Sequence, residues 1–405
     1  MSILSVALSG LQAASEDLEN ISQNIANSST SGYKSVSTQY EANYSGSSGS
    51  GVSVSGTTQS FDVDGDVVET DDTLDLAISG SGFFVLSNGD GTYAYSRSGD
   101  FSLDSDYNVV ASNGMNVEGY AVDADGNINY GTITDLAVSA TTIPASASTT
   151  IDLTANLNAD ATTIDTTSSS YAFDPTDGTT YNYSVSTDIY DSEGSSHTLT
   201  EYYVKTGDNE WTVYYSLDGD TVTDSNGDAV TSSLTFDTDG TISSSTSDIT
   251  LSLDMGSAVD DITLSISVSD ITQYASDFSS TSSSDGYTSG TLSDVYFDSD
   301  GYLWATYDNG ETVLQGQVVL ATFSNEDGLE AASGTIWYAT SDSGAATYGV
   351  AGSGSFGSLT VGYYESSNVD VSSELVDLMA TQQVYQANAK ALTAADDMAS
   401  VLFNI

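Results

Sequence analysis

The stretch from Ser372 to Ile405 contains neither Pro nor Gly, although the rest of the chain is rich in Gly, Ser and Thr. A mostly apolar set of residues recurs along it in steps of three and four, with one position missed at Asp396: Leu375, Leu378, Gln382, Tyr385, Ala389, Leu392, Ala399 and Leu402. This spacing predicts a long helix with a narrow apolar stripe, similar to a coiled-coil strand. Ser372 or Ser373 is a suitable N-cap. A helix this long with so thin a stripe needs a partner.

The start of the chain offers one. Residues 2–27 lack Pro, contain a single glycine at Gly10, and carry a second stripe: Leu4, Leu8, Leu11, Ala14, Leu18, Ile21 and Ile25. The turn-forming residues 28–32 end this helix. The two helices either form a hairpin that closes a domain, or use small residues to pack against neighbouring copies. Those small residues are Ala7, Ala14, Ala387, Ala389, Ala391 and Ala394, and both alternatives remain open.

Charge limits the partners of the chain. Lys and Arg total 4 against 58 Asp and Glu, which gives a formal net charge of −54. Such a field repels nucleic acid and anionic membranes, so we expect neither as a partner. Uniform acidity of this kind indicates adaptation to high salt, where counterions screen the self-repulsion. An alkaline or marine habitat is the alternative.

The sequence also bears on export. There is no Cys, so no disulfide framework can form. No stretch reaches 18 apolar residues, which argues against a membrane span. Glu16, Asp17 and Glu19 interrupt the N-terminal segment, so it is not an ordinary signal peptide, and export would need another route.

Between the helices we predict a mainly β chain with a nested architecture. Residues 31–70 are polar and Ser/Gly-rich, which is typical of a linker or a loosely ordered segment. Short strands separated by Asp/Asn-Gly turns follow. We expect a terminal helical domain (1–30 and 366–405), a split β domain (71–144 and 286–365) and an inserted all-β domain (145–285).

Chemistry-bearing patterns are nearly absent, and we predict no catalytic, cofactor or metal site and no enzyme activity. His197 is the only His, so a Ser-His-Asp triad has one candidate base among abundant Ser and Asp. Zinc sites need Cys or several His. The Asp-rich turns at 123–126, 224–227, 237–240 and 298–301 begin like calcium loops. They lack the Glu that closes such a loop, so we interpret them as hairpin turns.

Three groups of residues resemble the bacterial flagellar rod and hook proteins. The first is Ala7-Leu8-Ser9-Gly10-Leu11-Gln12-Ala13-Ala14 with Asn24-Ile25-Ala26-Asn27 and Thr30-Ser31-Gly32-Tyr33-Lys34. The second is Leu74-Asp75-Leu76-Ala77-Ile78 with Gly80, Gly82, Phe83 and Phe84, and Arg97-Ser98-Gly99-Asp100-Phe101. The third is Glu365-Ser366-Ser367-Asn368-Val369-Asp370 with Tyr385-Gln386-Ala387-Asn388. The large inserted domain favours the hook members over the shorter rod members.

The resemblance implies a structural subunit that polymerises with itself into a flexible curved tube joining rod to filament. Such a tube transmits motor torque as a universal joint. It implies export through the flagellar type III apparatus without a cleaved signal, and an extracellular location in the hook. The implied partners are further copies of the chain, the rod, the hook cap and the hook–filament junction proteins. The terminal helices would form the polymer core.

Two alternatives belong to other classes. An extracellular adhesin or surface-layer subunit of a salt-adapted bacterium would explain the acidity and the β domains, but it predicts an ordinary signal peptide. A secreted hydrolase on a β scaffold would need a catalytic constellation, which the sequence does not offer.

Overall fold

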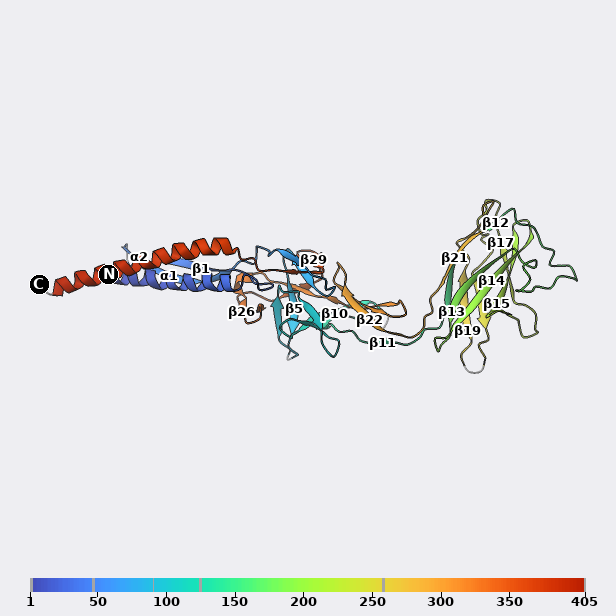
Figure 1. Ribbon diagram of the computed structural model, residues 1–405, viewed down its shortest axis with the longest axis horizontal. Coiled ribbons are helices and arrows are strands. Elements are labelled where there is room, and N and C mark those ends of the chain that lie inside the picture. The colour runs from blue at the N-terminus through green and yellow to red at the C-terminus, as the bar shows by residue number, and fades with distance from the viewer. Residues whose placement is uncertain (1–2, 46–47, 90, 124–125, 257–258, 404–405) are drawn as a thin grey trace. The chain divides into compact units, whose positions relative to one another are not determined.

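Two long helices lie at the ends of the chain, as the sequence predicts: α1 (Ile3–Ala26) and α2 (Val371–Phe403). They run side by side in opposite directions (Figure 1). The computed structural model describes residues 3–45, 48–89, 91–123, 126–256 and 259–403. The side chains of residues 3, 45, 48–50 and 399–403 lie outside this description.

Helix α2 begins earlier than the predicted serine cap. Asp370 precedes the first helical residue, and its Oδ1 accepts the backbone N–H of Ser372 at 2.9 Å. Asp370 therefore caps the helix, and Ser372 and Ser373 lie in its first turn. A carboxylate is the stronger cap here because it also faces the positive end of the helix.

Residues 36–45 and 48–59 pair as the two strands of an antiparallel hairpin, and the linker predicted over 31–70 is wrong for these residues. Strands β1 (Val36–Ser45) and β2 (Ser48–Gln59) pair from Val36↔Gln59 to Ser45↔Ser48. The hairpin packs along α1. The Asn20 amide donates to Thr38 Oγ1 at 2.9 Å, and the Val52 N–H donates to Ser9 Oγ at 3.3 Å. Backbone pairing and contact with a helix thus order a segment whose composition favours disorder.

The chain divides into two compact units, and each is described by itself. The first comprises Met1–Ser139, Asp294–Thr306 and Thr312–Ile405; the second comprises Ala140–Ser293 and Tyr307–Glu311. Besides the helices and the hairpin, the first unit contains short, mostly antiparallel strands. They are β3 (Val67–Glu69), β4 (Leu76–Ser79), β5 (Phe83–Ser87), β6 (Tyr93–Ser96), β7 (Phe101–Leu103), β8 (Val109–Ala111), β9 (Asn116–Val122), β10 (Ile128–Asp135), β24 (Thr312–Val318), β25 (Leu320–Thr322), β26 (Glu330–Ala332), β27 (Ile336–Tyr338), β28 (Thr347–Gly349), β29 (Ser358–Val361) and β30 (Tyr363–Glu365).

An aromatic cluster forms part of the core of the first unit. Phe83 packs edge-on against Trp337 with ring centroids 5.7 Å apart, and Phe61 contacts both rings. Strands β22 (Gly290–Phe297) and β23 (Tyr302–Tyr307) have residues in both units, and a single-turn 3-10 helix spans Glu326–Gly328.

The second unit is a β-sandwich of two five-stranded sheets. One sheet contains β12 (Thr150–Asn158), β18 (Ile249–Leu253), β19 (Ile262–Ser267), β20 (Ile271–Tyr274) and β21 (Ser279–Ser284). The other contains β13 (Tyr183–Tyr190), β14 (Ser196–Gly207), β15 (Glu210–Leu217), β16 (Asp220–Thr221) and β17 (Thr231–Thr235); the short β11 (Thr142–Ile143) lies outside both. Alternating inward residues from both sheets, such as Leu153, Val185, Trp211 and Leu264, form one apolar core.

Among the described residues, neither helix combines the length and hydropathy needed to cross a membrane.

Candidate assembly site

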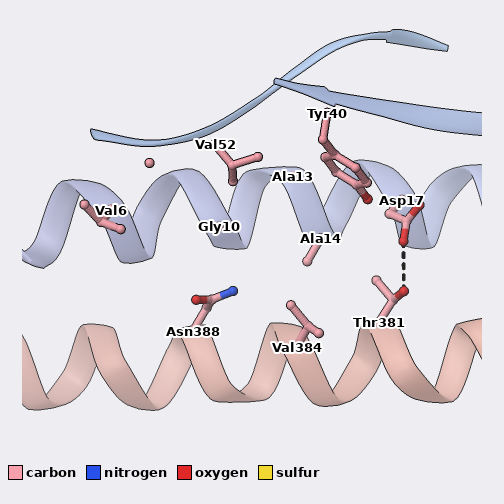
Figure 2. A pocket seen from close by; sticks show the side chains of 11 residues that line it. Val6, Gly10, Ala13, Ala14, Asp17, Tyr40, Val52, Thr381, Val384 and Asn388 are labelled. Atoms are coloured by element: carbon pink, nitrogen blue, oxygen red, sulfur yellow. Dashed lines mark hydrogen bonds between the residues drawn. The ribbon is translucent and has the colours of Figure 1, made fainter. Parts of the chain in front are cut away.

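The two terminal helices meet through polar and small side chains. The Asn24 amide donates to Glu374 Oε1 at 3.0 Å, and the Thr381 hydroxyl donates to Asp17 Oδ2 at 2.8 Å. One helical repeat further on, Gly10 faces Asn388, and a Cβ at Gly10 would lie 2.8 Å from the Asn388 amide nitrogen (Figure 2). Each contact is seven residues from the next on both helices, so an antiparallel heptad register holds the pair.

The predicted apolar stripes lie mostly beside this contact line. Ile21 is buried, but Leu8 is 47% exposed and Tyr385 is 41% exposed, and Leu4 and Leu375 are exposed as well. The remaining stripe residues are half-buried, namely Leu11, Leu18, Ile25, Leu378, Ala389 and Leu392, and the side chain of Leu402 lies outside the described residues. Within one chain the helices approach through small residues, because these permit closer backbone approach than leucines do, and a role of the stripe in assembly stays a prediction.

Two of the small residues proposed for contact between copies are used inside the molecule. Ala7 and Ala14 are each 4% exposed, whereas Ala387, Ala391 and Ala394 are exposed. Further apolar side chains on the helices stay open to solvent: Val6, Val371, Val376, Met379, Val384 and Met398. The two helices therefore pack against each other through small and polar side chains, and most of their larger apolar side chains remain exposed.

A groove of about 480 Å³ lies between α1, α2 and the β1–β2 hairpin (Figure 2). Val6, Ala13, Tyr40, Val52 and Val384 are among the residues that line it. Asp17 lies at one end, where burial and this neighbouring carboxylate raise the pKa of Tyr40 to about 12. The groove is thus an open, mainly apolar surface on the helical part of the first unit.

Asn24 joins α1 to both the hairpin and α2. Its Oδ1 accepts the Val36 N–H at 2.9 Å, and its amide nitrogen donates to the Val36 carbonyl at 2.9 Å as well as to Glu374. Burial raises the pKa of the Glu374 carboxyl, and the bond from Asn24 opposes that shift. This buried amide fixes where the chain leaves α1 and enters β1.

Two buried cations meet two carboxylates just beyond the helix pair. The Lys34 ammonium donates to Glu365 Oε1 at 2.8 Å and to the Val63 carbonyl at 2.7 Å. Arg97 Nη2 lies 2.5 Å from Asp64 Oδ1. Arg97 Nε lies 3.1 Å from Glu365 Oε2, a close ion pair that lacks the alignment of a hydrogen bond. We call these four residues the charge cluster.

The charge cluster is mostly buried, and Asp64 is its one half-exposed member. The side chains of Lys34 and Glu365 are 0% and 1% exposed, and the Gly65 N–H gives Glu365 Oε1 a further bond at 2.8 Å. Arg97 also donates to the Gly80 and Gly82 carbonyls, which assigns a structural role to the Gly80-Ser81-Gly82 turn. Burial and the neighbouring Arg97 lower the pKa of Lys34, while Glu365 opposes that effect. Removing one member would leave an uncompensated buried charge.

The chain segments on either side of the cluster are tied together as well. Asn368 Oδ1 accepts the Ser35 N–H at 2.8 Å, and its amide nitrogen donates to the Ser60 and Val63 carbonyls. Gly32 has φ +67° and donates its N–H to the Glu365 carbonyl at 2.8 Å. A Cβ there would lie 2.4 Å from the backbone nitrogen of Ser98, so only Gly fits.

The other motif residues either make hydrogen bonds to residues close in sequence or lie on the surface. The Asn27 amide donates to the Gln23 carbonyl at the end of α1, and Ser367 Oγ accepts the Val369 N–H at 3.3 Å. Val369 is half-buried and Gln386 is exposed. The structure therefore brings Asn24, Gly32 and Asn368 to one junction but does not bring Gln386 there.

Sequence reasoning missed the charge cluster. The available signal was scarcity: the chain has only four basic residues, and Lys34 and Arg97 lie in two of the recognised motifs. A side chain that persists against such a compositional bias is a candidate for a buried ion pair. No spacing rule links positions 34, 64, 97 and 365, because four separate chain segments supply them.

The features tested for catalysis and metal binding have structural contacts. His197 lies between Asp218 Oδ2, 2.7 Å from Nδ1, and Asp191 Oδ2, 3.5 Å from Nε2. The bond to Asp218 is the main cause that raises the pKa of His197, so the ring is held between two carboxylates. In the Asp-rich turns, Asp224 and Asp298 accept backbone N–H groups of their own turns. The described ranges contain no group of three or more His, Asp or Glu side chains placed to hold a metal ion.

Four family models match the chain, and together they cover residues 4–34, 77–287 and 360–405. They are described as "Flagella basal body rod protein" (residues 4–34), "Flagellar hook protein FlgE/F/G D1 domain" (77–167), "Flagellar basal body protein FlaE D2 domain" (156–287) and "Flagellar basal body rod FlgEFG protein C-terminal" (360–405).

Full-length relatives agree with these models. The chain is 36% identical to the flagellar hook protein FlgE of Escherichia coli and 37% identical to that of Salmonella typhimurium, each over 99% of both chains. It is 30% identical to the FlgE of Rhizobium meliloti, over 98% of this chain and 97% of the relative. These matches do not support the adhesin or surface-layer alternative.

A solved structure has a similar fold. The crystal structure of the Helicobacter pylori flagellar hook protein FlgE2 aligns with a TM-score of 0.54 and 14% identity, over 74% of this chain and 100% of that one. The part of the fold that aligns is thus shared with a hook protein. Together with the identity over the full length, these matches place the chain: it belongs to the flagellar hook protein family.

Proposed function

We propose that the chain is a structural subunit of the bacterial flagellar hook. It assembles with further copies of itself into a flexible, curved tube that joins the rod to the filament and transmits motor torque as a universal joint. The role is structural rather than enzymatic. The single observation that carries the assembly step is that the helix pair turns large apolar side chains outward. Exposed apolar surface gathered in this way is typical of a site that binds another protein molecule.

The proposed contact surface consists of exposed apolar residues on both helices together with the apolar groove. Leu4, Leu8, Leu375 and Tyr385 belong to it, and Gln386 extends it with a polar side chain. Because the helices already pair within one chain, copies would meet through these outer faces rather than by exchanging helices. We retain the division of the first unit into a helical domain (1–30 and 366–405) and a split β domain as part of this proposal.

The remaining partners follow from the place of a hook in a flagellum. They are the rod, the hook cap, the hook–filament junction proteins and the flagellar type III export apparatus, which would deliver the chain outside the cell without cleaving a signal peptide. A net charge of −54 means that copies repel one another, so assembly should require salt or a binding partner to offset the repulsion.

Sedimentation of the full chain across a range of salt, with electron microscopy of the pellet, tests the proposal. The double variant Leu8→Ser/Tyr385→Ser removes two outward apolar side chains and should reduce the pelleted fraction at least tenfold. Its thermal unfolding should stay close to that of the natural chain, because exposed positions contribute little to the stability of one molecule. Gln12→Ser/Gln383→Ser, which changes exposed polar positions on the same helices, is the matched control.

Unchanged pelleting of the double variant at every salt concentration would show that the outer helix faces do not drive assembly.

A further inference from the structure

The core of the second unit contains a carboxyl group. Along β14, Leu199, Glu201 and Tyr203 alternate toward the interior of the sandwich. Glu201 is 3% exposed and lies opposite Val185 on β13 and Tyr215 on β15. Those two neighbours belong to the apolar core, as do Leu153 and Leu264 of the facing sheet. Glu201 is thus an ionisable side chain in an otherwise apolar layer.

The polar contacts of Glu201 are too few for an ion. The Tyr203 hydroxyl donates to Glu201 Oε2. Glu201 Oε1 and the Tyr215 hydroxyl are both buried without a hydrogen-bond partner among the described residues. Lys205, further along β14, donates instead to the Ala159 and Ala161 carbonyls, at 2.5 and 3.2 Å. No ion pair involves Glu201 in the described part of the chain.

A neutral carboxyl suits these surroundings better than a carboxylate. Burying an unpaired charge in an apolar medium is costly, and such a group normally stays neutral instead. Burial raises the pKa of Glu201 to about 7, against an ordinary value of 4.5. The ionisable neighbours are Tyr203 and Tyr215, whose pKa values burial also raises, so they stay uncharged.

We propose that Glu201 makes the second unit proton-dependent: the sandwich is most stable while Glu201 is protonated and is weakened when this core carboxyl ionises. The sign follows from the two states of the chain. Unfolding releases the proton wherever the unfolded carboxyl is ionised and the folded one is not. Stability is therefore greatest below the unfolded pKa, falls as pH rises through the folded pKa, and changes no further above it. Most surface acids of a folded protein behave in the opposite way.

The test must report on the second unit alone, because the first unit holds a second carboxyl of raised pKa. Burial, together with the adjacent Asp135, raises the pKa of Glu118 to about 7. Trp211 lies in the sandwich core, and the two other tryptophans, Trp304 and Trp337, lie in the first unit. In a Trp304→Phe/Trp337→Phe chain, tryptophan fluorescence follows the second unit.

Thermal unfolding of this full chain is measured from about pH 5 to about pH 9, with and without Glu201→Gln. We expect the unfolding midpoint of the parent to fall by roughly 5–10 °C over this range beyond any fall in Glu201→Gln. The general self-repulsion of an acidic chain acts equally on both, so the difference isolates Glu201. Glu193→Gln, at an exposed position of the same unit, should keep the full fall of the parent.

An identical pH dependence in Glu201→Gln and in the parent would overturn the proposal. Should Glu201→Gln fail to fold, Tyr203→Phe decides instead. It removes the hydroxyl that stabilises the ionised form, so the fall must move to higher pH. Infrared spectra of a chain carrying Glu118→Gln give an independent reading, since the band of the protonated Glu201 carboxyl must be present near pH 6 and absent near pH 9. Absence of that band near pH 6 contradicts the proposal whatever the variants do.

Discussion

The helix pair of the first unit and the sandwich of the second unit bury opposite kinds of side chain. The helices meet through Asn24, Asp17 and Gly10 and turn Leu8 and Tyr385 outward. The sandwich buries Trp211, Leu264 and Ile151 between its sheets and places Ser and Thr outside. The sandwich buries its large apolar side chains between its own sheets, whereas the helix pair leaves many of them exposed. This difference is the one expected between a self-contained unit and a unit that assembles with other molecules.

A second contrast concerns buried charge. The first unit buries Lys34 and Arg97 together with the carboxylates of Glu365 and Asp64. The second buries Glu201 with only a tyrosine hydroxyl beside it. A paired network should be insensitive to pH near neutrality but should fail when one member is removed, whereas a single carboxyl should respond to pH.

The largest effect should come from breaking the charge cluster. Glu365→Gln keeps the shape of the side chain but leaves Lys34 and Arg97 with a single, half-exposed partner in Asp64. We expect a loss of about 3–5 kcal/mol in the free energy of unfolding of the first unit, measured by denaturant titration. Glu330→Gln makes the same charge change at an exposed position and should stay within about 0.5 kcal/mol of the natural chain. A loss below about 0.5 kcal/mol in Glu365→Gln would mean that the charge cluster does not stabilise the first unit.

The sandwich core should respond almost as strongly. Trp211→Ala removes a fully buried ring and leaves Gln273 Oε1, 2.6 Å from the indole nitrogen, without its donor. We expect the second unit to lose about 3–5 kcal/mol of stability, followed by near-ultraviolet circular dichroism during denaturant titration. A separate variant, Leu8→Ala, makes the comparison with the helix pair. It should lower the free energy of unfolding by less than about 0.5 kcal/mol. Equal losses in the two variants would mean that the helix pair has a conventional core.

A smaller effect should follow from filling the close approach between the helices. Gly10→Val places methyl groups where Asn388 lies, and we expect it to weaken the pair by about 1–3 kcal/mol. Hydrogen exchange of the α1 backbone measures the change. Asn388→Ala should restore part of the loss in the double variant, since the two side chains compete for one space. Ser15→Val, at an exposed position of the same helix, is the control.

The sequence predicted the broad architecture because the relevant patterns are local. Stretches without Pro and with at most one Gly predicted the two helices, and alternating residues such as Trp211, Val213 and Tyr215 predicted strands with an inward face. The contact line between the helices could not be predicted in this way. Hydrophobicity favoured the leucines, but the interface formed where small and polar side chains allow close approach and hydrogen bonding.

The hairpin and the charge cluster were missed for a related reason. The order of residues 36–59 comes from pairing with themselves and from contact with α1, and a composition count detects neither. The cluster joins positions 34, 64, 97 and 365, whose proximity exists only after folding. Glu201 could not be singled out from the sequence, because it is one of 58 acidic residues and only the structure shows that it is buried without an ion-pair partner among the described residues.

The burial of the cations has a practical consequence for labelling and proteolysis. Of the four basic residues in the chain, Lys34, Arg97 and Lys205 are buried, and Lys390 on α2 is exposed. An amine-reactive dye meets one accessible lysine side chain on the folded protein, and trypsin finds three of its four cleavage positions enclosed. Helix α2 therefore carries the one exposed lysine side chain, and once the α-amino group is blocked a fluorophore on Lys390 can follow a copy of the chain without any engineered residue.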